Sequence, residues 1–274
     1  MLTTLTFVVL TQITTADVTR FPVTSLNRQQ PRILQRIFDR RTEVFGTTIL
    51  ATPKVSDAAI THTAGILAEF LDNDEDGNVD VPRVAGLMRE RGATMIVFVN
   101  EREFEQHGET LESLFDRRVL QPLWETEIHP DGAKQGHFDA TLEEVLHLIT
   151  VTGYAEVWPD AFGLNSRSRL AQAMDIARGG RFRRTPRRYP RQAWFTYNDR
   201  TCDYECQMVE YFYWGLTSLQ GGQMFPGRLE QIRDEWPLNT PKKFRSYDAA
   251  LYTLLTDPEF SMPMRLPNGR YRDQ

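Results

Sequence analysis

The sequence predicts an α+β fold with a small mixed sheet, a central helix of the kind that carries active sites, and a mostly helical C-terminal half. Two observations support this prediction. Runs of β-branched and apolar residues typical of strands lie in the first half of the chain, and segments with helical spacing separate and follow them. The chain of 274 residues, 41% hydrophobic and 25% charged, is long enough to bury a sizeable core.

Helices and strands are expected to alternate in the first half. The elements, in order, are a helix within 31–46, a strand at 47–52, helices at 56–71 and 81–91, and strands at 93–100 and 120–128. The helix at 56–71 is opened by Ser56 or Asp57, both good N-cap residues. Pro122 cannot donate a ladder hydrogen bond, which favours the edge of the sheet for the last strand.

The second half is expected to be helical. It contains the central helix at 140–153, which Gly153 ends, then a loop-rich tract, a late helix at 203–220 and a shorter one at 247–255. We expect 17–160 to form an α+β domain and 161–274 a helical lobe that packs on it, as one structural unit.

Residues 1–16 resemble a secretory signal peptide. A short apolar centre, Leu5–Leu10, is followed by the small residues Thr14 and Ala16, which would precede a cleavage site at Asp17. The alternative is a first β-strand, since threonine and valine suit strands.

The two cysteines, Cys202 and Cys206, are close enough in sequence to close a small disulfide loop in an oxidising compartment. A metal-binding thiol pair is less favoured, because the sequence has no second pair. Together with the N-terminal segment, the predicted disulfide indicates a secreted, extracellular protein.

An acidic segment, DNDEDGNVD, follows the second predicted helix. It places side-chain oxygens and a glycine turn in the order of an EF-hand calcium loop, which it resembles. The resemblance implies Ca²⁺ binding by Asp72, Asp74, Asp76, Asn78 and Asp80.

The acidic loop departs from the EF-hand pattern at its last position. Arg83 stands where the bidentate glutamate is usual, so Glu69 or a distant carboxylate would have to replace it. The alternative is a solvated acidic turn, in which aspartate and glycine are common.

The central helix carries EEVLH, in which Glu143 and His147 share a face and Glu144 adjoins them. This resembles the H-E-x-x-H signature of zincin metallopeptidases of the gluzincin type, with glutamate as the first ligand. A third ligand is expected from a later helix, where Glu210 lies among apolar and aromatic residues. The resemblance implies Zn²⁺, or the Mn²⁺ or Fe²⁺ that carboxylate-rich sites favour, bound by Glu143, His147 and Glu210. Glu144 is then the catalytic general base.

The same residues allow other interpretations. Thr141 and Glu144 fit a capping box, and His147 could pair with Glu143 in the core. Glu144 and His147 also form an E-x-x-H pair, as in ferritin-like carboxylate sites. The protein would then be a non-catalytic extracellular calcium-binding or matrix protein, or an iron or manganese oxidoreductase.

Seven arginines lie between Arg178 and Arg191. The segment from Arg181 to Arg184 resembles a proprotein convertase site, which implies cleavage after Arg184. A solvated basic loop and a surface for anionic glycans or phosphate are the alternatives. The net charge of −5 argues against nucleic acid as a partner, and no segment is long and apolar enough to span a membrane.

The sequence therefore predicts a secreted metal-dependent hydrolase that acts on peptides or proteins and contains a structural calcium site. Its reaction also needs a donor for the tetrahedral oxyanion, for which Tyr154, Tyr197 and His137 are candidates.

Overall fold

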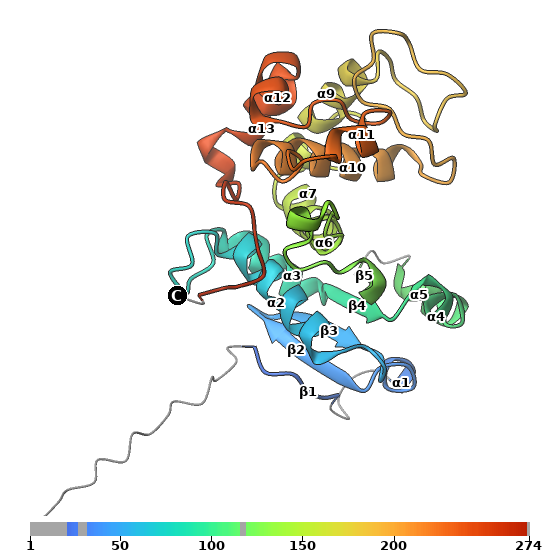
Figure 1. Ribbon diagram of the computed structural model, residues 1–274, viewed down its shortest axis with the longest axis vertical. Helices are drawn as coiled ribbons and strands as arrows, with labels where there is room; N and C mark the ends of the chain where they lie inside the picture. Colours follow the sequence, from blue (N-terminus) through green and yellow to red (C-terminus); the bar gives the residue numbers. More distant parts are fainter. Residues whose placement is uncertain (1–20, 27–31, 116–118, 273–274) are drawn as a thin grey trace, which may run out of the picture.

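The computed structural model describes residues 21–26, 32–115 and 119–272, and the predicted signal peptide lies outside them. Within these residues the fold is α+β, as predicted. One sheet of five strands lies at one end of the molecule (Figure 1). Its strands, in both chain and spatial order, are β1 (Thr24–Ser25), β2 (Arg40–Val44), β3 (Thr47–Ala51), β4 (Thr94–Phe98) and β5 (Leu120–Trp124). β1, β2 and β3 pair antiparallel, whereas β3, β4 and β5 pair parallel, so the sheet is mixed.

Two helical crossovers connect the parallel strands. The first consists of α2 (Asp57–Leu71), the acidic loop and α3 (Pro82–Arg91), and the second of α4 (Glu101–Glu105) and α5 (Gly108–Phe115). Alternate residues of β3 and β4 enter different cores because successive side chains of a strand point to opposite faces. Ile49 belongs to the main core with α2 and α3, and Leu50 to a smaller core with α1 (Arg32–Gln35) and α5.

Helices make up most of the second half, and α6 lies between the sheet and the later helices (Figure 1). These elements are α6 (Thr141–Ile149), the π-helical turn η3 (Thr150–Tyr154), α7 (Ala155–Val157), α8 (Pro159–Phe162), α9 (Arg169–Ala177), α10 (Tyr204–Leu219), α11 (Arg228–Ile232), α12 (Pro241–Tyr247) and α13 (Ala249–Leu255). The main core continues from the sheet through α6 into these helices. No helix in the described part of the chain is both long and apolar enough to cross a bilayer.

Several predicted elements are confirmed. β3, β4 and β5 lie where the strands were expected, and β5 is at the edge of the sheet. Ser56 is the N-cap of α2, and its hydroxyl accepts a hydrogen bond from the backbone N–H of Ala59. Cys202 and Cys206 form a disulfide at the start of α10.

One predicted helix is much shorter than expected. The helix expected within 31–46 is confined to α1, and β2 follows it, because Thr42 and Val44 are buried in alternation with exposed Glu43. The tract after the central helix is loop-rich, as predicted, and it also contains the short helices α8 and α9.

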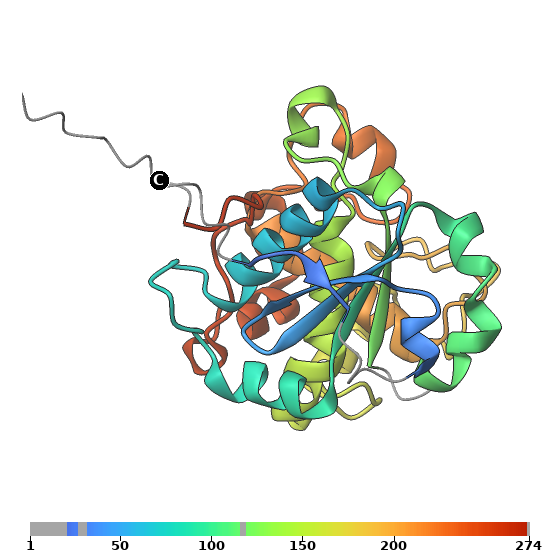
Figure 2. The ribbon, with the colours of Figure 1, turned by 90° about the horizontal axis from the view of Figure 1, so that it is seen from below.

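The C-terminal segment runs back from the helical half along α2 to the acidic loop (Figure 2). The backbone N–H of Arg265 donates to Asn73 Oδ1 at 2.7 Å, and the N–H of Asn268 donates to Glu69. The hydroxyl of Tyr271 donates to the buried Asp72. The end of the described chain thus holds α2 and the acidic loop together.

Gly153 does not end the central helix, which continues through η3 and α7. Its role is close packing, because a Cβ at this position would lie 2.7 Å from Cγ1 of Val84 on α3. Glycine in the middle of a helix lowers helix stability, but here its missing side chain allows the two helices to pack closely.

We expect Gly153→Ala to lower the free energy of unfolding by about 1 to 3 kcal/mol, since overpacking forces neighbours to shift. Gly86→Ala on the facing helix is the matched control, because a Cβ there meets nothing within 4 Å. It should be neutral or stabilise by up to about 1 kcal/mol. Urea unfolding measures both, and equal effects of the two substitutions would contradict the packing role.

Candidate metal centre

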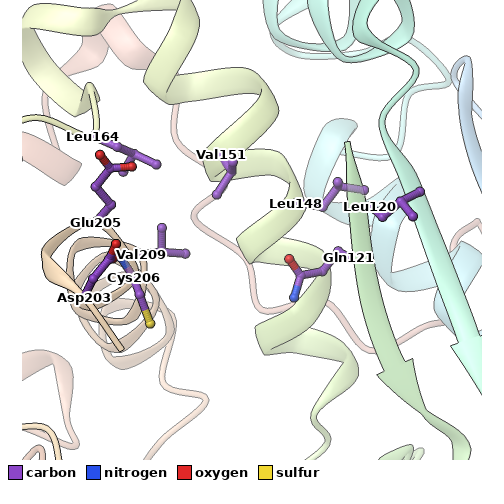
Figure 3. Close-up of a pocket in the computed structure, with 9 residues that line it drawn as sticks. All are labelled: Leu120, Gln121, Leu148, Val151, Leu164, Asp203, Glu205, Cys206 and Val209. Carbon is purple, nitrogen blue, oxygen red and sulfur yellow. Dashed lines mark hydrogen bonds between the residues drawn. The ribbon is translucent and has the colours of Figure 1, made fainter. Parts of the chain in front are cut away.

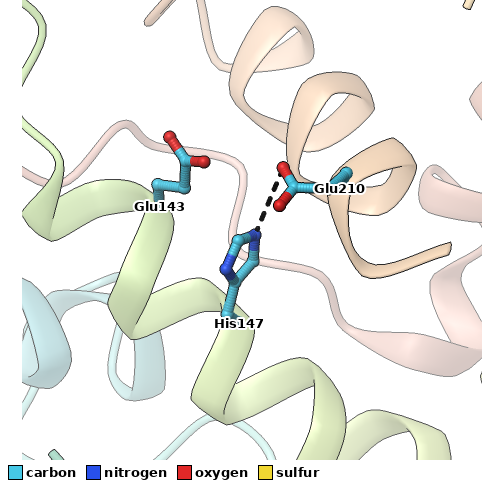
Figure 4. A group of neighbouring side chains, drawn as sticks. All are labelled: Glu143, His147 and Glu210. Carbon is cyan, nitrogen blue, oxygen red and sulfur yellow. Dashed lines mark ion pairs between the residues drawn. The ribbon is translucent and has the colours of Figure 1, made fainter. Parts of the chain in front are cut away.

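Two helices bring the three predicted transition-metal ligands together. Glu143 and His147 project from α6 toward α10, and Glu210 projects from α10 toward them (Figure 4). One ligating atom from each residue lies within 4.8 Å of the other two. His147 Nε2 is 3.8 Å from a Glu210 oxygen, and both residues are only 7% exposed. The cluster is therefore a buried N/O site of the kind that a divalent cation can occupy.

His147 Nε2 is buried and makes no hydrogen bond within the described structure. A buried polar atom without a hydrogen bond is costly, and here it faces a carboxylate. A metal ion between them would satisfy the ring nitrogen and both glutamates, so the residues fit the group that the sequence implies.

The pKa values of the predicted ligands show how strongly burial and mutual repulsion act on them when no cation is bound. Burial, and next the charge of Glu210, raise the pKa of Glu143 to about 8. Burial alone would lower the pKa of His147, but Glu210 and Glu144 outweigh it and raise that pKa to about 9. Burial also raises the pKa of Glu210. Protons thus reside in the cluster near neutral pH, and a bound cation would displace them.

Two tyrosines contact the carboxylates. Burial raises the pKa of both carboxyls, whereas the hydroxyl of Tyr197, in the segment between α9 and α10, lowers that of Glu210, and the hydroxyl of Tyr213 of α10 lowers that of Glu143. Burial raises the pKa of each phenol above its ordinary value, so both hydroxyls keep their protons and act as donors. Tyr213 was missed by the sequence analysis, although its position three residues after Glu210 placed it on the same helix face.

Glu144 lies near the other ring nitrogen of His147, and its charge also acts on Glu143 and Glu210. One of its oxygens accepts a hydrogen bond from Gln121 Nε2 of β5 at 2.5 Å and lies 3.6 Å from His147 Nδ1. The capping-box interpretation is wrong, because Ala140 is the N-cap of α6 and no side chain caps the helix. Glu144 is therefore placed to orient the imidazole, and its 24% exposed side chain also borders solvent.

The other candidate oxyanion donors lie elsewhere. Tyr154 is buried against Trp158 and Phe162, and the ring of His137 contacts that of His129. Of the three candidates, only Tyr197 contacts a predicted ligand.

The acidic loop gathers a second group of oxygens. Carboxylate oxygens of Asp72, Asp74 and Asp80 lie within 4.8 Å of one another, and Asp72 is fully buried. Gly77, at the sixth position, has a φ of 101°, as the sharp turn of a calcium loop requires. Burial and the three neighbouring aspartates raise the pKa of Asp80.

The remaining predicted residues of this loop point elsewhere. Asp76 and Asn78 are outside the group of three, and Asp76 Oδ1 accepts from the backbone and side-chain nitrogens of Asn78. Arg83 lies over the ring of Trp158. Glu69 accepts backbone N–H groups of the C-terminal segment, so it does not replace the missing bidentate ligand in this conformation.

Comparison of the chain with protein-family models, curated proteins and solved structures found no match. The resemblances to zincins and EF-hands therefore depend on the residues and their geometry alone.

Asp139 fixes the start of α6. It accepts hydrogen bonds from His62 Nε2 at 2.6 Å and from the backbone N–H groups of His129 and Thr141. Burial by itself raises the pKa of Asp139, but the hydrogen bond and charge of His62 and the other donors outweigh it and hold the pKa below 3.8. The ionised carboxylate thereby anchors the helix that carries the cluster.

Because the folded-state pKa of Asp139 is lowered, its stabilisation is present above pH 3.8 and is lost as the pH falls through the folded-state pKa. We expect Asp139→Asn to cost about 1 to 3 kcal/mol of unfolding free energy at pH 7. The difference from wild type should stay constant down to about pH 5 and shrink in acid. Urea unfolding across this range, with exposed Asp160→Asn as control, measures it; a difference that grows in acid would refute the assignment.

Proposed function

We propose that this protein is a metal-dependent hydrolase that acts on peptide bonds. The observation that carries the proposal is the buried meeting of Glu143, His147 and Glu210, with the free ring nitrogen of His147 facing a carboxylate. Zn²⁺ is the first candidate, and Mn²⁺ or Fe²⁺ also suit a site with two carboxylates.

The chain supplies groups for each part of such a reaction. A metal held by Glu143, His147 and Glu210 would supply polarisation of the scissile carbonyl and activation of water. Glu144, beside the cluster and partly exposed, accepts the proton of the attacking water. Tyr197 keeps its hydroxyl proton, and by turning this O–H from Glu210 to the developing oxyanion it donates a hydrogen bond there.

An extended substrate would lie in two adjoining cavities, which none of the three predicted ligands lines and which connect to the cluster through Gln121 and Glu144. A cavity of about 280 Å³ lies between β5, α6 and the start of α10 (Figure 3). One end is formed by Gln121, the partner of Glu144. A second cavity of about 320 Å³ shares Val151 and Leu164 with it. Two adjoining hollows along one helix suit a peptide better than a small compact molecule.

The acidic loop is proposed as a structural Ca²⁺ site. Asp72, Asp74 and Asp80 already converge, and Asp76 and Asn78 are near enough in sequence to complete the shell. We also propose secretion, with which the disulfide is compatible, and cleavage after Arg184, which is exposed between α9 and α10.

Metal analysis tests the centre directly. Elemental mass spectrometry of protein purified without chelator should find one transition metal per chain, lost in His147→Ala because the only nitrogen ligand is gone. His129→Ala is the control, since that ring lies outside the cluster. Calcium should be unchanged in both variants. If the wild-type protein contains calcium but no transition metal, the proposed hydrolase is refuted and the alternative of a non-catalytic calcium-binding or matrix protein is favoured.

Glu144→Gln separates two roles of this residue. As general base, its loss should reduce hydrolysis of a peptide library about 100-fold or more with metal content unchanged. As an orienting partner of His147, its loss should instead weaken metal binding. Glu90→Gln is the control, because that exposed carboxylate of α3 lies outside the cluster and lines neither cavity. Full activity in Glu144→Gln would exclude it as the base.

A further inference from the structure

Arg228 is a buried cation with an unusual set of partners. Its side chain lies 4.2 Å from the ring centre of Phe138, and the residue is 8% exposed. Within the described residues no carboxylate lies within 4 Å of its guanidinium, so this charge is not neutralised by an ion pair. Its Nε donates instead to Gln223 Oε1 at 2.8 Å. A buried charge without an ion pair is costly, and the Phe138 ring, Gln223 and the more distant charge of Glu235 offset part of that cost.

The chemistry of Arg228 fixes which atom donates and which accepts in each hydrogen bond between Arg228, Gln223 and Tyr213. A guanidinium can only donate, so Gln223 must present its oxygen to Arg228 and its nitrogen to the other side. That nitrogen donates to the Tyr213 hydroxyl at 3.1 Å, within a fully buried pair. Tyr213 accepts there, so its own proton is left to be donated on the side of Glu143, whose pKa burial raises and the hydroxyl lowers.

Tyr213 connects this chain of hydrogen bonds to the predicted metal ligands. A carboxylate that accepts a hydrogen bond from a tyrosine on one oxygen is held in a single orientation, and its other oxygen is left for a metal. Tyr213 also packs edge-on against the His147 ring, at 5.8 Å between centres, so it contacts two predicted ligands.

We propose that Arg228, Gln223 and Tyr213 form a buried relay that positions the Glu143 carboxylate for a divalent transition metal. This inference rests on the proposed function, since it assumes that Glu143 is a ligand. The three are positioning residues, because none of them is itself placed among the ligands. They extend the metal centre from α6 and α10 to α11.

The affinity for Zn²⁺, measured by competition with a chromogenic chelator, tests the relay. Tyr213→Phe should bind Zn²⁺ about 10- to 100-fold more weakly than wild type, as is typical when a partner of a metal ligand is removed. Tyr211→Phe is the matched control: it is buried on the same helix and loses a 2.6 Å hydrogen bond to Asp248, yet should bind Zn²⁺ as wild type does.

Gln223→Met should weaken Zn²⁺ binding in the same direction. Combined with Tyr213→Phe it should add little, because both changes interrupt one chain. If Tyr213→Phe binds Zn²⁺ with wild-type affinity, the relay is refuted, whereas the proposed metal centre is not. A wild-type protein that binds no Zn²⁺, Mn²⁺ or Fe²⁺ would overturn the proposed function, and the relay with it.

A cycle in metal-free protein distinguishes positioning from general support of the fold. Tyr213→Phe and Glu143→Leu, alone and together, should change the free energy of unfolding in urea non-additively if the hydroxyl acts on this carboxylate, since leucine offers no acceptor. Strictly additive shifts, even with weakened Zn²⁺ binding, would assign Tyr213 a packing role only and overturn the proposed relay.

Discussion

The contact between α6 and α10 is the constraint on which the rest of the structure depends. Both helices are largely apolar, yet they meet through two glutamates and a histidine that water scarcely reaches. Desolvating such groups is unfavourable unless each finds a partner. The surroundings supply them from distant parts of the chain: an edge strand holds Glu144, and the segment before α10 brings Tyr197 to Glu210. The architecture around the cluster serves mainly to keep polar groups satisfied in an apolar interior.

Much of this could be predicted because it depends on local spacing. The i, i+4 relation of Glu143 and His147 and the improbable burial of Glu210 were sufficient to identify three groups that the fold brings together. The strands at 47–51 and 94–98 announced themselves through β-branched residues. By contrast, β2 was misjudged, since its charged exposed face masks a two-residue period.

What could not be predicted depends on contacts between distant segments. Gln121 has no distinguishing feature in sequence, and it matters only because β5 passes beside α6. Gln223 and Arg228 lie in a turn-rich stretch, where an arginine is usually exposed. Gly153 was interpreted as a helix end, whereas its missing side chain makes room for Val84. In each case the residue's role is set by its spatial neighbour, which an isolated pattern does not encode.

The segment that holds the acidic loop has a consequence for folding. Tyr271 and Asp72 are 199 residues apart, so their hydrogen bond closes a very long stretch of chain into a ring. The hairpin of β2 and β3 and the contacts between α2 and β3 join residues that are much closer in sequence. Because the entropy of closing a loop is lost before the contact is gained, long-range pairs of this kind form late. The acidic loop is therefore expected to gain its last contacts after the sheet has assembled.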